Sequence, residues 1–169
     1  MNQIEFINHV KPFKDKMFRL AKRLLVSTEE AEDATQEVLV KLWNKNHVLE
    51  QYTSSEAYAM TITKNHCLDV LKSKRATNLQ IVHNNYIENG ASLQQKVEDS
   101  DSWNWVEKWI NELPEQQKLI IQMRDIEQYE FAEIAEIMEM NEATIRVALS
   151  RARKTIREKL TNTHNYGIQ

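Results

Sequence analysis

The chain has very little Gly and Pro, with two of each among its 169 residues. Average usage would give about twenty of these two residue types at this length. β-Hairpins, bulges and parallel α/β units depend on them, and neither Gly90 nor Gly167 has a second Gly nearby with which to form a phosphate-binding loop. The shortage argues against sheet proteins and dinucleotide-binding folds, and it predicts an all-α protein.

The sequence also lacks the residues and segments that several classes of site require. The single cysteine, Cys67, excludes an internal disulfide and a multi-cysteine zinc site, and the five histidines are scattered, so we expect neither a metal nor a cofactor. The sequence has no run of about eighteen apolar residues and no apolar signal segment at its N-terminus, which predicts a cytoplasmic protein without membrane insertion. No nucleophile–base pair or pair of acids stands out, so we do not expect an enzyme.

Charge is distributed unevenly along the chain, although the net charge is only −3. Residues 1–76 carry 12 basic and 10 acidic side chains, residues 77–142 carry 4 and 14, and residues 143–169 carry 6 and 1. An acidic middle therefore separates two more basic ends. A basic helix at one end of an acidic protein is a candidate phosphate-binding surface.

Helical periodicity divides the chain into two units. Apolar spacing and capping residues (Ser27 with Glu30, Thr53 with Glu56) predict helices over 3–24, 28–45 and 54–75. After a polar stretch, four more helices are expected over 103–112, 114–126, 129–138 and 142–160. We therefore expect two small helical domains, 1–75 and 103–163, joined by a flexible linker over 76–102 and followed by a tail over 164–169. The linker should leave the domains without a fixed relative position.

The last two predicted helices resemble a DNA-binding arrangement. A short turn over 139–141, with Asn141 as a good N-cap, separates them. In the second helix Ile145, Leu149 and Ala152 form a buried stripe, while the opposite face is rich in arginine and lysine. A helix fits the DNA major groove, and its arginines neutralise phosphates, so this pattern predicts a helix-turn-helix. A solvated amphipathic hairpin is the alternative.

Three segments of the chain resemble regions of the sigma-70 family of RNA polymerase sigma factors, in its extracytoplasmic-function group. The segment LPEQQKLIIQMRDIEQYEFAEIAEIMEMNEATIRVALSRARKTIREKL resembles the domain that reads the −35 promoter element. EEAEDATQEVLVKLW resembles the helix that binds core polymerase, and AYAMTITKNHCLDVLKSKR the helix that reads the −10 element. The three matches follow the order of the family.

The sequence departs from the family pattern at several positions. The turn of the helix-turn-helix usually holds Gly, but here it holds Glu139, so it must form without a residue that favours positive φ. The recognition helix has Val147 and Ala148 where Ser and Arg are usual, which removes one cation. The usual Phe, Trp and Arg of the first domain are replaced by Leu39, Tyr58 and Lys64.

The resemblance implies three sets of site residues. The contacts with the β′ clamp helices of core RNA polymerase fall on Asp33, Gln36 and Glu37, which from the residues alone are also an ordinary exposed acidic face. The −10 contacts fall on Tyr52, Lys64, Asn65, Asp69, Lys72, Lys74 and Arg75. The −35 contacts fall on Thr144, Arg146, Val147, Ser150, Arg151, Lys154 and Arg157. The loop over 46–55 would form a pocket for an unstacked base, with Tyr52 as a stacking ring or, alternatively, as a ring that closes the domain core.

The expected partners are therefore core RNA polymerase, through its β′ clamp helices and β flap, promoter DNA, and an anti-sigma factor that the sequence does not identify. Two functions from other classes compete with this reading. A stand-alone helix-turn-helix regulator would bind its duplex site without polymerase, but the sequence has no evident ligand-sensing domain. An interaction-only helical adaptor would not need the basic helix.

Overall fold

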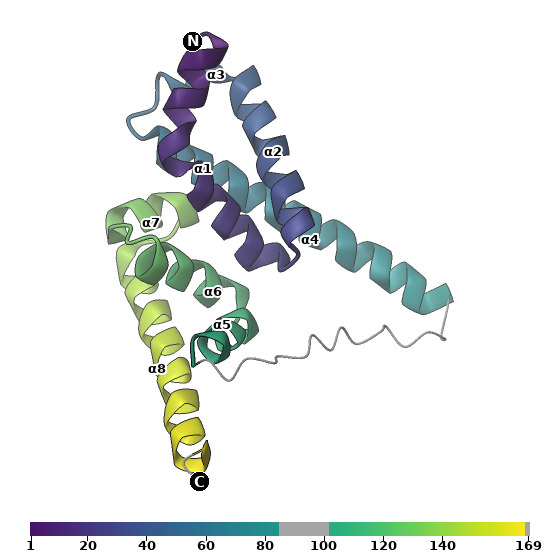
Figure 1. Ribbon diagram of the computed structural model, residues 1–169, viewed down its shortest axis with the longest axis vertical. Coiled ribbons are helices and arrows are strands. Elements are labelled where there is room, and N and C mark those ends of the chain that lie inside the picture. Colours follow the sequence, from purple (N-terminus) through teal and green to yellow (C-terminus); the bar gives the residue numbers. More distant parts are fainter. Residues whose placement is uncertain (85–101, 168–169) are drawn as a thin grey trace.

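The computed structural model describes residues 1–84 and 102–167, and the side chains of 1–78 and 103–163. The described regular structure is helical, which confirms the predicted fold class (Figure 1). The first unit consists of α1 (Gln3–Leu25), α2 (Thr28–Asn44), the short α3 (Asn46–Leu49) and α4 (Ser55–Asn84). The second unit consists of α5 (Ser102–Glu112), α6 (Glu115–Ile121), the π-helical turn η1 (Gln122–Ile126), α7 (Phe131–Met138) and α8 (Glu142–Gly167).

The first unit packs α1, α2 and α4 around one apolar core. Met17 and Leu20 of α1, Leu42 of α2 and Met60 of α4 are all fully buried. The helix starts follow from local chemistry, because Asn2 forms a reciprocal capping box with Glu5 and the Ser27 hydroxyl accepts from the backbone N–H of Glu30. These caps satisfy backbone donors that helix ends leave without a partner.

Several predicted boundaries were wrong by a few residues or more. The cap of α4 is Ser54, whose hydroxyl accepts from the N–H of Ala57, rather than Thr53. The predicted loop over 46–55 contains α3. The helix expected to end at Arg75 continues to Asn84, and so occupies the start of the predicted linker; of the remaining linker, 85–101 lies outside the described residues. Similarly, α8 continues into the predicted tail as far as Gly167.

A π-helical turn interrupts the second unit between α6 and α7. The backbone N–H of Glu127 donates to the Gln122 carbonyl at 3.0 Å, five residues back, which is the π pattern. Gln128 follows with φ of 62°, and the N–H of Tyr129 donates to the Met123 carbonyl at 2.9 Å. This irregular stretch places the polar side chains of Gln122 and Glu127 in a buried position.

The two units pack against each other. In Figure 1, α6 and α7 lie against α1 and α4, and the residue contacts place α4 on α7 and α1 on α6 and η1. The buried apolar residues of both units form one continuous cluster. The two units therefore have a fixed relative position in the structure, whereas the predicted linker led us to expect none.

Candidate functional site

The turn between α7 and α8 forms a helix-turn-helix. Ile134 and Ile137 of α7 are fully buried, and Glu139 ends the helix in the left-handed region at φ 54° and ψ 45°. The side-chain oxygen of Asn141 accepts from the N–H of Thr144 at 2.8 Å and from its hydroxyl at 2.7 Å. The predicted N-cap is therefore present, and the turn does adopt a positive φ without glycine.

The amphipathic helix α8 buries one face and exposes the predicted −35 residues. Ile145, Leu149 and Ala152 are buried. All seven predicted −35 residues lie on this helix and are exposed: Thr144, Arg146, Val147, Ser150, Arg151, Lys154 and Arg157. Val147 keeps 48 % of its surface exposed.

Two arginines of α8, Arg146 and Arg153, contact other residues of the second unit. The Arg146 guanidinium lies over the Phe131 ring, 4.7 Å from its centroid. Arg153 donates to both carboxylate oxygens of Asp125, one of them at 3.1 Å, and this hydrogen bond raises the pKa of Arg153. Arg153 therefore fixes α8 to η1. Arg153 thus has an ion-pair partner within the protein, although its side chain is still 47 % exposed.

Most of the predicted −10 residues lie on the exposed surface of α4. Asn65, Asp69 and Lys72 are exposed and share one face, since they are spaced by four and three residues. Beyond them, Lys74 forms an ion pair with Glu30, and Arg75 Nη2 lies 3.5 Å from a carboxylate oxygen of Glu115.

Tyr52 lies at the edge of the same region, where 45 % of its surface is exposed. Its ring stacks on that of Tyr58 with centroids 4.2 Å apart and planes 19° apart. The ring therefore neither closes the core completely nor stands free. One of its faces is occupied by Tyr58.

Lys64 differs from the other −10 candidates because it is only 7 % exposed. Its ammonium donates to the backbone carbonyl of Ile137 at 2.7 Å, near the C-terminal end of α7 in the other unit. Burial lowers the pKa of Lys64, and the nearby Glu139 carboxylate partly opposes that shift. In this arrangement the Lys64 side chain does not face solvent.

The predicted polymerase-binding residues are exposed on α2, and one of them is tied to α4. Asp33, Gln36 and Glu37 all face solvent. A carboxylate oxygen of Glu37 lies 3.1 Å from His66 Nε2, and Lys41 Nζ lies 2.9 Å from His66 Nδ1. Because an ammonium can only donate, His66 Nδ1 accepts the hydrogen bond from Lys41. The Nε2–H group of His66 then donates to the Glu37 carboxylate. His66 thus connects the candidate polymerase surface to the candidate −10 helix.

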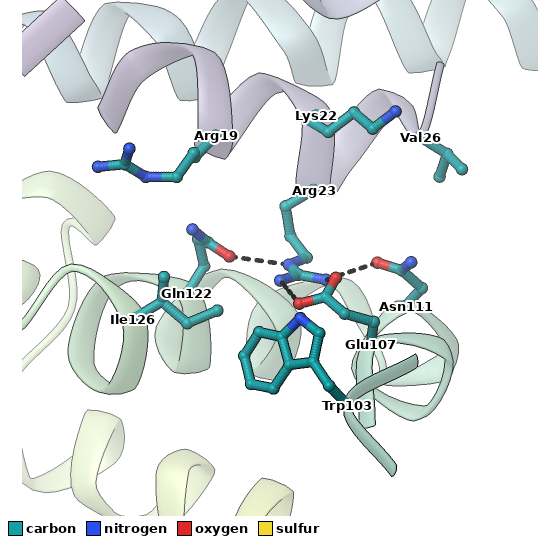
Figure 2. A pocket seen from close by; sticks show the side chains of 9 residues that line it. All are labelled: Arg19, Lys22, Arg23, Val26, Trp103, Glu107, Asn111, Gln122 and Ile126. Atoms are coloured by element: carbon teal, nitrogen blue, oxygen red, sulfur yellow. Dashed lines mark hydrogen bonds and ion pairs between the residues drawn. The ribbon is translucent and has the colours of Figure 1, made fainter. Parts of the chain in front are cut away.

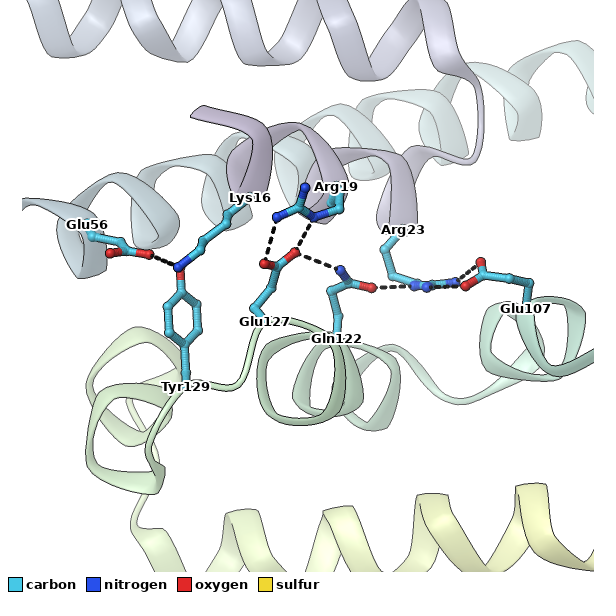
Figure 3. Close-up of polar contacts among 8 residues, drawn as sticks. All are labelled: Lys16, Arg19, Arg23, Glu56, Glu107, Gln122, Glu127 and Tyr129. Carbon is cyan, nitrogen blue, oxygen red and sulfur yellow. Dashed lines mark hydrogen bonds and ion pairs between the residues drawn. The ribbon is translucent and has the colours of Figure 1, made fainter. Parts of the chain in front are cut away.

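Sequence reasoning missed a polar cluster between the two units (Figure 3). Arg19 donates to both carboxylate oxygens of Glu127, at 2.6 and 2.9 Å. Arg23 donates from Nε to Gln122 at 2.8 Å and through its two Nη atoms to Glu107 at 2.8 and 3.0 Å. No local pattern could have shown these pairs, because the partners are 84 to 108 residues apart.

A cavity of about 370 Å³ lies beside this cluster (Figure 2). Its walls come from both units: the α1 end supplies Lys22 and Val26, and the second unit supplies Trp103, Glu107 and Ile126. The guanidinium of Arg23 points across it and also donates to Asn111 at 2.9 Å. The cavity is therefore a product of the closed arrangement.

The described residues offer no group of three or more His, Cys, Asp or Glu side chains that could hold a metal ion. Cys67 is a buried free thiol, and burial raises its pKa to about 12. Among the described helices, none combines the length and the apolar character that crossing a bilayer requires.

Each of the two units matches the model of a known protein family. Residues 9–77 match the family model of sigma-70 region 2, and residues 103–156 match that of sigma-70 region 4. The chain belongs to the sigma-70 family. Its relatives place it in the extracytoplasmic-function group. The chain is 22 % identical, over 169 residues, to the ECF RNA polymerase sigma factor SigW of Bacillus subtilis (strain 168). The alignment covers 94 % of this chain and 90 % of that protein.

A second ECF sigma factor, SigE of Mycolicibacterium smegmatis (strain ATCC 700084 / mc(2)155), is 25 % identical over 154 residues, covering 89 % of this chain and 60 % of that protein. The fold matches that of the sigma factor RpoE of Bartonella quintana, solved in complex with the anti-sigma factor NepR, with a TM-score of 0.75, 24 % identity and coverage of 93 % and 97 % of the two chains. CnrH, solved with the cytosolic domain of CnrY, gives a TM-score of 0.66 at 17 % identity, covering 95 % and 90 %. This sigma factor therefore acts in transcription initiation as a DNA-binding protein that recognises promoters.

Proposed function

We propose that this sigma factor binds core RNA polymerase, directs it to one class of promoters and helps to melt the −10 region. The observation that carries the proposal is the helix-turn-helix, in which α8 buries its apolar stripe and presents the candidate −35 residues on its opposite, solvent-facing side. The match of the first unit to sigma-70 region 2 supports the polymerase and −10 roles.

The polymerase contact is assigned to Asp33, Gln36 and Glu37, with the β′ clamp helices as partner and the β flap as the contact of the second unit. Support comes from the exposure of the three side chains on one helix. The carboxylates of Asp33 and Glu37 would pair with cations of the partner, and the Gln36 amide would form hydrogen bonds with it. Because such exposed pairs add little affinity each, the interface would depend on several contacts acting together.

The −10 contact is assigned to Asn65, Asp69 and Lys72, with Tyr52, Lys64, Lys74 and Arg75 around them. Asn65 can both donate to and accept from a base edge, and Lys72 can follow the phosphate backbone. Asp69 would orient a neighbouring cation or amide, since phosphates repel a carboxylate. The exposed face of the Tyr52 ring is available to stack on an unpaired base.

The −35 contact is assigned to the exposed face of α8. Thr144, Arg146 and Val147 lie in its first turns, where a recognition helix reaches base edges, whereas Arg151, Lys154 and Arg157 lie further along and suit phosphates. An anti-sigma factor is proposed as a further partner, because the sigma factor RpoE, whose fold this chain shares, was solved in complex with the anti-sigma factor NepR.

Run-off transcription with purified core polymerase on a pool of genomic fragments tests the proposal. We expect promoter-specific transcripts only when the chain is added. A stand-alone regulator would bind its duplex site alone and yield no such transcripts. A chain that neither co-purifies with core polymerase nor starts transcription at any fragment would refute the proposal.

A further inference from the structure

Arg146 rests on an aromatic ring, whereas the other cations of the candidate −35 surface do not. Its guanidinium lies over Phe131, 4.7 Å from the ring centroid. Within the described part of the chain, the side chains of Arg151, Lys154 and Arg157 form no ion pair, hydrogen bond or ring contact. All four cations are exposed to solvent. The ring contact therefore distinguishes one basic side chain of this surface from its neighbours.

The Phe131 ring is itself fixed in the second unit. Phe131 is the first residue of α7, is half-buried and packs against the apolar core. The Arg124 guanidinium of η1 lies 4.4 Å from the centroid of the same ring. Arg124 in turn donates from Nη1 to the backbone carbonyl of Tyr129 at 2.8 Å. Because the core and Arg124 both hold the ring, it gives Arg146 a stable surface on which to stack.

Stacking on a ring suits a guanidinium that must keep its donors available. The group is planar and weakly hydrated, so one face can lie on an aromatic ring while the N–H groups at its edge remain free to donate. An exposed arginine otherwise samples many rotamers and loses that freedom when it binds. A ring that restricts Arg146 beforehand reduces this loss, and so favours a contact that requires one orientation. The positive charge of Arg124 acts in the same direction, because it repels the Arg146 guanidinium away from η1.

The position of Arg146 indicates which kind of partner would use this orientation. The N-cap Asn141 precedes α8, so Arg146 lies in the second turn of the helix, near the end that reaches base edges in a helix-turn-helix. An arginine fork that donates to O6 and N7 of guanine is the most common specific contact in the major groove. We propose that Phe131 is a positioning residue for promoter recognition: it holds the Arg146 guanidinium in place as a fork for a guanine of the −35 element. The reading of guanine rests on the proposed function of α8, whereas the stacking does not.

Nuclear magnetic resonance of the free, full-length chain tests the stacking without DNA. A proton above the face of an aromatic ring is shielded, so the Nε–H resonance of Arg146 should lie upfield of those of Arg151 and Arg157. The Arg146→Lys variant lacks this resonance and thereby assigns it. In Phe131→Leu the resonance should return to the ordinary arginine range, whereas Phe131→Tyr keeps the ring and should keep the shift. An Arg146 resonance that is unshifted in the native chain would refute the stacking.

Binding to DNA tests the reading of guanine. The full-length chain is first mixed at low salt with a duplex pool randomised over one helical turn, and the bound fraction is sequenced. We expect one position at which the native chain enriches guanine and Arg146→Lys, which keeps the charge but lacks the planar fork, does not. In the duplex so selected, that guanine is then replaced by a deazaguanine without the N7 acceptor. The replacement should weaken binding of the native chain, measured by fluorescence anisotropy.

Variants of Phe131 show whether the ring is needed for this discrimination. Phe131→Leu should reduce the preference for guanine over deazaguanine about two- to fivefold, the range expected for loss of a cation–π contact at an exposed site. Phe131→Tyr should retain the preference. Adding Phe131→Leu to Arg146→Lys should cause no further loss, because both changes act on the same contact. If Phe131→Leu instead weakens binding to both duplexes equally, the ring only packs the helix-turn-helix, and the proposal is refuted.

Two comparisons exclude other causes. Phe18→Leu makes the same substitution at a half-buried position of α1, outside the candidate site, and should leave the preference for guanine unchanged. Phe131→Leu removes no charge, so its log–log salt slope should equal that of the native chain, unlike that of a variant that loses a phosphate contact. An effect of Phe18→Leu as large as that of Phe131→Leu, or a reduced slope in Phe131→Leu, would contradict a role in orientation.

Run-off transcription separates this proposal from the sigma assignment on which it rests. If the native chain directs core polymerase to promoters but enriches no guanine that depends on Arg146, the sigma assignment stands and the positioning role of Phe131 is wrong. If the native chain neither starts transcription nor selects any DNA sequence, both are wrong. The resonance of Arg146 would still show whether its guanidinium stacks on the ring.

Discussion

Replacing Glu139 by glycine should relieve backbone strain, because Glu139 ends α7 in the left-handed region at φ 54° and ψ 45°. A residue with a Cβ loses roughly 1–2 kcal/mol in that conformation, whereas glycine does not. Glycine in turn loses more backbone entropy on folding, about 0.4–1 kcal/mol. The difference should leave the Glu139→Gly variant about 0.5–1 kcal/mol more stable than the Glu139→Ala variant.

The comparison must be made with Glu139→Ala rather than with the native chain. The Glu139 carboxylate attracts the Lys64 ammonium, so its removal changes the charge balance as well as the backbone. Both variants lose that attraction equally, and their difference isolates the left-handed backbone. Urea unfolding followed by circular dichroism measures the free energies, and thermal unfolding should show a gap of about 1–4 °C. A glycine variant no more stable than the alanine variant would refute the assignment of strain to this turn.

Three further predictions follow from the site. Arg151→Ala should weaken binding to all DNA sequences alike and reduce the log–log salt slope by about 0.9, measured by fluorescence anisotropy; an unchanged slope would place Arg151 off the DNA. Asp33→Arg with Gln36→Ala should abolish holoenzyme assembly in gel filtration without changing the circular dichroism spectrum, while assembly at normal affinity would contradict the clamp-helix assignment. The raised pKa of Cys67, about 12 against an ordinary 9.0, means that above pH 9 the unfolded chain releases a proton that the folded chain keeps. Stability should therefore fall, relative to Cys67→Ala, by about 1.4 kcal/mol per pH unit, and parallel pH profiles of the two proteins would refute this.

The sequence predicted the helices well because their signals are local. Capping by Ser27 and Asn141, and the stripe of Ile145, Leu149 and Ala152, depend on neighbours within one or two turns. The predicted helix boundaries were wrong where the local signals were weak. The run ending at Arg75 resembled a helix end, since basic residues favour C-termini, yet no residue there stops the helix and it continues to Asn84.

For the candidate site, the sequence predicted which residues share an exposed helix face, but not the contacts that they make with other elements. Exposure of Asn65, Asp69 and Lys72 follows from periodicity, and the structure places them accordingly. The burial of Lys64 does not follow from it, because the cause lies on α7 in the other unit. The stacking of Tyr52 on Tyr58 is likewise a contact between a loop and a helix, and no spacing rule predicts it.

The acidic middle of the chain shows what charge patterning can and cannot establish. Its excess of acids indicates a poor surface for DNA, since phosphates repel carboxylates. The same pattern does not show where the acids point. Glu107 and Glu127 face cations of α1, and Glu115 lies near Arg75 of α4. The imbalance between the basic first unit and the acidic middle is therefore partly resolved by pairing within the molecule.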